Sequence, residues 1–151
     1  MHLGYRVTAC WAVVCLVSAL GCNSTSYKTA PVSGVVKLDG MPLVGASVNF
    51  VPQSTDPVNP GGSGSYGKTD ETGRYTLKLI ENDGAGAAVG THKVSISAPQ
   101  GDDRTKEGGI VTDRVPPRYR GSETTLTFEV VPGGSKEANF DLTSTTVSSG
   151  S

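Results

Sequence analysis

Few side chains in this sequence could perform chemistry on a substrate. Its two histidines are His2 and His92, and only His92 lies beyond an apolar N-terminal segment. A zinc site typically needs three or four protein ligands, so a single histidine cannot build one. A hydrolytic site needs a base that activates water and donors or cations that hold the developing negative charge. Because His92 alone could serve as that base, we expect no catalytic residues, no metal and no cofactor.

Carboxylates between residues 98 and 123 are the next candidates for ligand chemistry. Four of them could in principle surround a calcium ion: Asp102, Asp103, Glu107 and Asp113. They lack the regular alternate spacing and the glycine of a calcium-binding loop. We therefore interpret them as a solvated run of charge.

The overall charge excludes one class of partner. The chain has 151 residues, with 13 Lys+Arg against 14 Asp+Glu and a formal net charge of -1. Nucleic-acid binding needs a basic face large enough to release counterions from the phosphates. We expect no nucleic-acid partner.

The N-terminal segment predicts export. Arg6 is followed by the sequence VTACWAVVCLVSALGC, a run without charge from Val7 to Cys22. A secretory signal peptide has this order of a positive residue, a short apolar run and small residues. The run is too short for a transmembrane helix, which needs about 20 apolar residues. We interpret residues 1–21 as a signal peptide.

The end of this leader, Ala19-Leu20-Gly21-Cys22, resembles the lipobox of bacterial lipoproteins. The resemblance implies a lipid on the Cys22 sulfur and cleavage that makes Cys22 the first mature residue. Acyl chains such as palmitate then hold the protein on a bilayer, at ~0.8 kcal/mol per buried methylene. Residues 22–31 become a flexible tether. The alternative is an ordinary cleaved signal peptide in which Cys22 is incidental.

This resemblance also implies a location. The protein is expected to be exported and anchored to a membrane of the bacterial cell envelope, facing the periplasm or the cell exterior.

Beyond residue 31 the chain alternates between apolar and polar positions. Such period-two patterning buries one set of side chains and leaves the other in water, as in a half-buried strand. A less regular first strand, VSGVVKL, begins at Val32. With glycine- and aspartate-rich turns between the runs, the pattern predicts an all-β fold, namely a seven-stranded antiparallel β-sandwich over 32–142 and a disordered tail over 143–151. The alternating apolar sets are Ala46, Val48 and Phe50; Tyr75, Leu77 and Leu79; Val94, Ile96 and Ala98; Leu126, Phe128 and Val130; Ala138, Phe140 and Leu142.

Spaced elements of the same region resemble a known family. They read VSGVVKLDGMPLVGASVNFVP, GKTDETGRYTL, GAAVGTHKVSIS and VPPRYRGSETTLTFEVVPGGSKEANFDL. They resemble the carboxypeptidase-regulatory-like, transthyretin-like β-sandwich of short bacterial envelope lipoproteins. Where that family commonly has an aromatic residue this chain has His92, which we expect near the edge of the sandwich. The motif positions that shape turns or let the chain pass into a strand are Asp39, Gly40, Gly45, Asp70 and Gly73.

The tetrapeptide Tyr119-Arg120-Gly121-Ser122 resembles the end of another transthyretin-like family, the hydroxyisourate hydrolases. There the tetrapeptide closes the chain and acts with two histidines and an arginine from other strands. Here two predicted strands follow it, and His92 is the one histidine that could assist. A hydroxyisourate-hydrolase-like enzyme is therefore a remote alternative.

Two long connections, 52–67 and 98–123, are rich in Gly, Pro and charge. Long connections in compact domains often carry function. In the second we expect Tyr119 to pack on the sandwich, and Arg118 and Arg120 to point to solvent on alternate sides. Gly121-Ser122 should release the chain into a strand from Thr124.

Arg114, Arg118, Tyr119 and Arg120 thus form a possible recognition loop. The sequence predicts a non-enzymatic, lipid-anchored β-sandwich that serves the cell envelope as a structural or interaction module, attached to the membrane through its N-terminal lipid. The alternative is a ligand-binding module in which the 98–123 loop recognises a glycan or a peptide. Either role implies an envelope protein or glycan as the partner.

Overall fold

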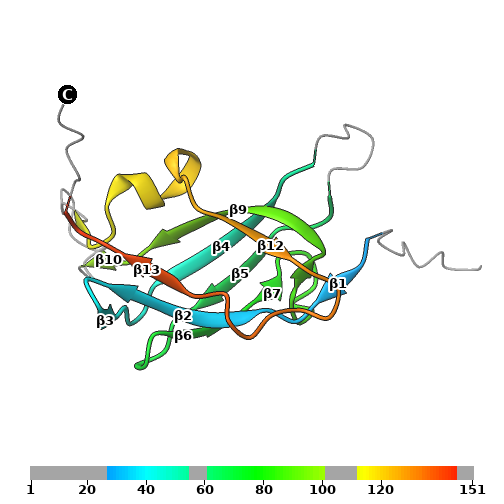
Figure 1. Ribbon diagram of the computed structural model, residues 1–151, viewed down its shortest axis with the longest axis horizontal. Helices are drawn as coiled ribbons and strands as arrows, with labels where there is room; N and C mark the ends of the chain where they lie inside the picture. The colour runs from blue at the N-terminus through cyan, green and yellow to red at the C-terminus, as the bar shows by residue number, and fades with distance from the viewer. Residues whose placement is uncertain (1–26, 55–60, 101–111, 146–151) are drawn as a thin grey trace, which may run out of the picture.

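The computed structural model describes residues 27–54, 61–100 and 112–145, and within these ranges the protein consists almost entirely of strands and their connections (Figure 1). The predicted signal peptide and Cys22 lie outside these ranges. The described residues contain thirteen strand segments, several of them only two residues long, and two 3-10 helices. None of the helices in this part of the chain is long and apolar enough to cross a bilayer. The predicted all-β class is confirmed.

The larger of two main sheets has five strands. These are β4 (Ser47–Pro52), β5 (Ser65–Lys68), β7 (Lys78–Leu79), β9 (Gly90–Ser97) and β12 (Thr127–Val130). Their order is β12-β9-β4-β5-β7, and all neighbours are antiparallel. Alternate residues of β4 and β9 are buried, as the period-two pattern predicts.

The smaller sheet contains β2 (Ser33–Leu38), β3 (Met41–Pro42), β6 (Arg74–Thr76) and β13 (Phe140–Leu142). Its order is β13-β2-β3, and β6 also pairs with β2. The pairing of β13 with β2 is parallel, so the prediction of a wholly antiparallel arrangement is wrong at this pair. The reason is that β12 belongs to the larger sheet and β13 to the smaller one. The chain crosses between the sheets over 131–139, so β12 and β13 do not form a hairpin.

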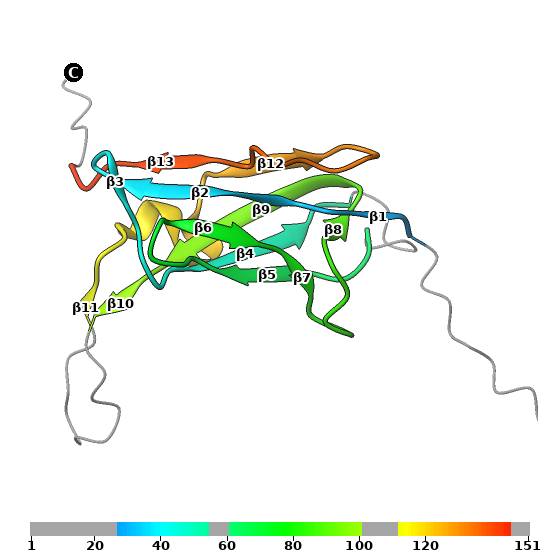
Figure 2. The same ribbon diagram turned by 90° about the horizontal axis from the view of Figure 1, so that it is seen from below.

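The two sheets lie as layers over a shared core (Figure 2). Phe50 from the larger sheet lies with its ring 6.2 Å from that of Phe140 in the smaller one, and 5.8 Å from that of Phe128. Its third ring neighbour is His92, at 5.7 Å. His92 is fully buried, so its expected position near the edge is wrong. Its ring packs beside Phe50 in the core.

Strand β5 was not predicted, because its residues SYGK contain no alternating apolar pair. Its first three residues lie in the connection 52–67, yet the strand occupies an interior position of the five-stranded sheet. Ser65 and Gly67 face the core and are buried. A Cβ on Gly67 would lie 2.8 Å from the Thr76 carbonyl oxygen and 3.2 Å from the Tyr75 ring. The two layers approach so closely here that a small side chain or none is required.

Two short ribbons close the ends of the layers. At one end β1 (Thr29–Ala30) pairs with β8 (Ala87–Ala88), and at the other β10 (Pro99–Gln100) pairs with β11 (Thr112–Asp113) (Figures 1 and 2). Residues 29–30 were expected to belong to the tether. That boundary is wrong, because Ala30 is buried in the core and paired to β8.

The turn residues singled out in the sequence occupy connections between strands. Asp39 and Gly40 form the two-residue turn between β2 and β3, with φ values of 51° and 80°. Asp70 accepts hydrogen bonds from the backbone nitrogens of Thr72 and Arg74 through Oδ1. Gly45 and Gly73 also have positive φ, at 71° and 75°.

Candidate binding site

In the described part of the second long connection, the partly buried carboxylate of Asp113 holds the backbone in place. Asp113 Oδ1 accepts hydrogen bonds from the backbone nitrogens of Ala98, at 2.9 Å, and Val115, at 2.8 Å. Val115 is 1% exposed and belongs to the core. Asp113 was interpreted from the sequence as part of a solvated charge run, and that interpretation is wrong. The carboxylate ties β11 to the end of β9 and fixes where the following arginines begin.

After Val115 the chain passes through two 3-10 helices, η1 (Pro117–Tyr119) and η2 (Gly121–Glu123). The prolines at 116 and 117 fix φ near −65°, which suits such a turn. The predicted release into a strand from Thr124 is wrong, since η2 intervenes and β12 begins at Thr127. Thr124 is instead buried, and its hydroxyl donates to the Val94 carbonyl at 2.6 Å.

Arg118 is folded back onto the protein. Its Nη2 donates to the Thr143 carbonyl, and to the Thr145 carbonyl at 2.8 Å. The guanidinium also lies 4.6 Å above the centre of the Tyr119 ring. The expectation that Arg118 points to solvent is wrong, because the C-terminal segment supplies its acceptors. The predicted disordered tail is therefore held by this side chain at 143–145, and residues 146–151 lie outside the described ranges.

Tyr119 packs against the core, as expected, and is only partly buried. Its hydroxyl lies 3.4 Å from Thr143 Oγ1. This hydrogen bond, assisted by the positive charge of Arg118 and opposed by burial, lowers the pKa of the Tyr119 hydroxyl. The ring is thus fixed between the core and the guanidinium above it.

Arg120 turns toward Asp113 rather than away from the protein. Its Nη1 lies 3.8 Å from Asp113 Oδ2, and the Asp113 side chain is only 9% exposed. The Nε of Arg120 is buried and has no acceptor among the described residues. The expectation of a solvent-directed side chain is met only in part for this arginine, because 38% of the side chain is exposed while Nη1 faces Asp113.

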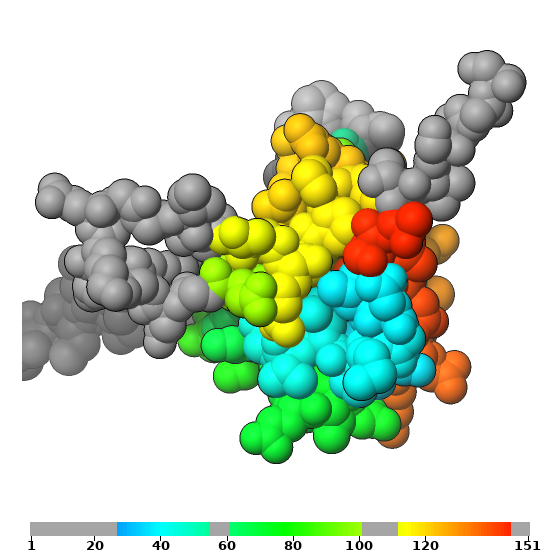
Figure 3. All heavy atoms as spheres, turned by 90° about the vertical axis from the view of Figure 1, so that its left-hand side faces the viewer, coloured from blue at the N-terminus to red at the C-terminus, as the bar shows by residue number. Residues whose placement is uncertain are grey.

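Arg114 is the third arginine at this place. Its Nη2 donates to the Val44 carbonyl at 2.6 Å. Arg114, Arg118 and Arg120 line one pocket together with Asp113 and Ser144, and its volume is about 560 Å³. We call it the arginine pocket. Figure 3 shows this end of the molecule, where residues 112–120 (yellow) adjoin the C-terminal residues 143–145 (red).

The electrostatics of the arginine pocket favour an anion. Among the described residues that line it, three guanidinium groups face one carboxylate, Asp113. A second carboxylate, Asp39, lies next to the rim and accepts a hydrogen bond from the Ser144 nitrogen at 2.9 Å. Hydrogen bonds from Ser144, and then the charge of Arg118, lower the pKa of Asp39. Among the described residues, the positive groups around the pocket still outnumber the negative ones.

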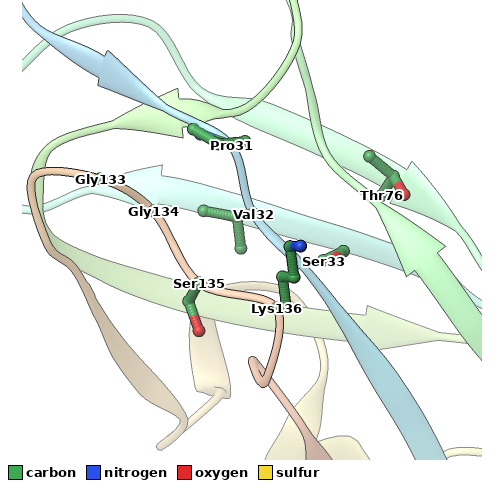
Figure 4. A pocket seen from close by; sticks show the side chains of 8 residues that line it. All are labelled: Pro31, Val32, Ser33, Thr76, Gly133, Gly134, Ser135 and Lys136. Atoms are coloured by element: carbon green, nitrogen blue, oxygen red, sulfur yellow. The ribbon is translucent and has the colours of Figure 1, made fainter.

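Two other hollows are lined by fewer charged side chains. One, of about 180 Å³, lies between residues 31–33, where the chain enters β2 of the smaller sheet, and the 133–136 connection (Figure 4). Its sides are joined by backbone hydrogen bonds between Ser33 N and Ser135 O and between Ser135 N and Pro31 O, both 2.9 Å. Lys136 is the one ionisable residue that lines it.

The other hollow, of about 380 Å³, lies on the outer side of β4 and β9 beside η2. Lys93 lines it, but its ammonium group already donates to the Ser122 carbonyl at 2.7 Å. A further hollow of about 330 Å³ is lined by Lys68, Asp70 and Arg74. Among the described residues, the arginine pocket thus has the larger excess of positive groups.

The structure does not place His92 beside the Tyr119-Arg120-Gly121-Ser122 tetrapeptide in a common pocket. His92 Nδ1 lies 3.0 Å from the Gly90 carbonyl, and Nε2 has no partner among the described residues. Burial lowers the pKa of its imidazole, against the smaller opposing effect of the Gly90 carbonyl. None of the pockets described above is lined by His92.

Of the four residues of the possible recognition loop, Arg114, Arg118 and Arg120 line the pocket, whereas Tyr119 does not. Sequence reasoning took Asp113 as solvated charge and missed Ser144, which no local pattern links to the arginines. Comparison with known proteins adds no assignment. No family model, no curated protein and no solved structure matches this chain.

Proposed function

We propose that this protein is a non-catalytic, lipid-anchored interaction module of the bacterial cell envelope, and that it binds an anionic partner through the arginine pocket. One observation carries the proposal. Arg114, Arg118 and Arg120 line a single pocket whose wall is held by internal hydrogen bonds. A preformed wall lowers the entropic cost of binding.

The leader and the fold support the remaining parts of the proposal. Ala19-Leu20-Gly21-Cys22 suits a lipidation site, with Cys22 as the modified residue. The two layers with their shared core suit a transthyretin-like, carboxypeptidase-regulatory-like sandwich, in which the seven described strands of three or more residues form the framework and the two-residue strands extend it.

The arrangement of the two ends is favourable for an anchored receptor. The described chain begins next to β1 at one end, while η1, β10 and β11 lie at the opposite end (Figures 1 and 2). A lipid on Cys22, only five residues before Tyr27, would tether the β1 end to the bilayer. The arginine pocket would then face away from the membrane, toward partners in the envelope.

Replacement of Cys22 tests the anchor. Cys22→Ser should move the protein from the detergent phase to the aqueous phase of a detergent extraction and abolish acylation of the N-terminus by mass spectrometry. Cys15→Ser is the matched control, because this residue would leave with the signal peptide and should change nothing. If the unaltered protein is found in the aqueous phase with an unmodified N-terminus, the anchor is wrong.

A second experiment tests the pocket as the binding element. The lipidated protein is crosslinked in intact cells, and its envelope partners are compared with those of Arg114→Gln. We expect the variant to lose at least one abundant crosslinked partner. An unchanged set of partners would instead favour a passive structural component.

A further inference from the structure

We infer that the arginine pocket recognises the carboxylates of an acidic peptide segment in a partner protein. The inference rests on the proposed function and specifies the chemistry of the ligand. Three features of the pocket carry it. Some arginine N–H groups have no acceptor among the described residues, Arg118 already binds the backbone of 143–145, and the Arg118 guanidinium covers one face of the Tyr119 ring.

Several N–H groups of the pocket arginines have no hydrogen-bond acceptor among the described residues. A guanidinium carries five N–H groups in a planar fork that matches a carboxylate in a bidentate manner. Among the described residues, Arg114 and Arg118 form hydrogen bonds only through Nη2. The Nε of Arg120 is buried without an acceptor, which is costly for a polar group. Incoming carboxylate oxygens would accept from the accessible N–H groups of Arg114, Arg118 and Arg120 rather than from the buried Arg120 Nε.

The structure already shows a peptide segment bound to one of these arginines. Residues 143–145 offer the carbonyl oxygens of Thr143 and Thr145 to Arg118 Nη2. This guanidinium therefore lies beside a bent backbone segment and, among the described residues, donates to it through Nη2. The pocket volume of about 560 Å³ exceeds what a single carboxylate needs, and it falls in the roughly 300–1,000 Å³ range of ligand sites.

The covered tyrosine argues against an acidic sugar as the ligand. Bound sugars usually stack on an open aromatic face, and Tyr119 carries the guanidinium of Arg118 at 4.6 Å on one face while packing toward the core. No aromatic residue is among the described residues that line the pocket, whereas Pro116 and Pro117 are. Rigid prolines and arginines form a surface suited to an acidic peptide.

Fluorescence anisotropy of labelled hexaglutamate, added to the full-length lipidated protein in neutral detergent, tests the inference. We expect saturable binding that weakens as salt rises, and no binding of labelled hexaglutamine. Arg114→Gln should weaken binding by about tenfold or more, the effect of losing a charge-assisted hydrogen bond. Arg120→Lys, which keeps the charge but not the fork, should also weaken it.

Arg74→Gln is the matched control, because Arg74 is an exposed arginine on β6 that does not line the pocket. It should leave the affinity within about twofold. Equal losses for Arg74→Gln and Arg114→Gln would overturn the inference, since binding would then follow net charge alone. Circular dichroism of each variant verifies that it is folded.

Two competitors distinguish the ligand classes. If oligogalacturonate or inorganic phosphate displaces hexaglutamate more effectively than unlabelled hexaglutamate does, the peptide assignment is wrong. Absence of hexaglutamate binding also overturns it, and the crosslinking comparison with Arg114→Gln then shows whether the proposed function fails as well. A failure of the Cys22 anchor would leave the hexaglutamate result unaffected.

Discussion

Gly34 provides the sharpest test of how the chain packs between β2 and the segment entering β13. Gly34 lies in β2, opposite Tyr75 of β6. A Cβ at this position would lie 2.0 Å from the carbonyl oxygen of Ala138 and 2.4 Å from its carbonyl carbon. Both atoms belong to the backbone, so no side chain can rotate away. Gly34→Ala therefore forces residue 138 to move.

The cost follows from what residue 138 does. Its carbonyl accepts the Tyr75 hydroxyl at 2.7 Å, and its nitrogen donates to the Ser33 carbonyl at 3.1 Å. Loss of two such hydrogen bonds costs about 1 kcal/mol each. Displacement of tightly packed neighbours adds about 1–3 kcal/mol. We expect Gly34→Ala to lower the free energy of unfolding by about 3–5 kcal/mol, a large part of the roughly 5–15 kcal/mol typical of a domain.

Urea denaturation followed by circular dichroism measures this loss through the midpoint at constant slope. Gly40→Ala is the matched control, since a Cβ there meets nothing within 4 Å and only the positive φ of 80° is unfavourable. It should cost about 1–2 kcal/mol. If Gly34→Ala is no more destabilising than Gly40→Ala, the close approach of β2 to residue 138 is wrong.

Two further predictions concern buried ionisable groups. Burial lowers the pKa of His92 below its usual 6.5, so the unfolded state takes up the proton first as the pH falls. The contribution of neutral His92 to stability is thus fully present above pH 6.5 and declines on acidification toward the folded-state pKa. When urea midpoints are measured between pH 7.5 and 5, the midpoint of His92→Phe should fall less steeply than that of the unaltered protein. Parallel profiles for the two proteins would contradict the assignment. Asp113→Ala leaves the backbone nitrogens of Ala98 and Val115 without their acceptor and should lower the free energy of unfolding by about 1–3 kcal/mol. Amide hydrogen exchange should become faster at both residues. Unchanged exchange would show that the carboxylate does not hold the loop.

The alternation of apolar residues predicted which side chains of the main strands face the core. Val48 and Phe50 in β4, and Val94 and Ile96 in β9, are buried as expected. This prediction succeeds because the direction of a side chain from a strand is a local property of the backbone. The same local reasoning fails at β5, where Ser65 and Gly67 are buried although neither is a large apolar residue. At Gly67 the neighbouring backbone and the Tyr75 ring leave no room for a side chain.

By itself the sequence determined the all-β class, the inward-facing residues of the main strands and the glycine-rich turns, because each depends on neighbours close in the chain. Only the tertiary structure decided that β13 pairs with β2 in parallel, that His92 is buried beside Phe50, and that three arginines share one pocket. The arginines were visible as residues but not as a site. Their positions depend on acceptors at residues 44, 113 and 143–145, which only long-range packing brings together.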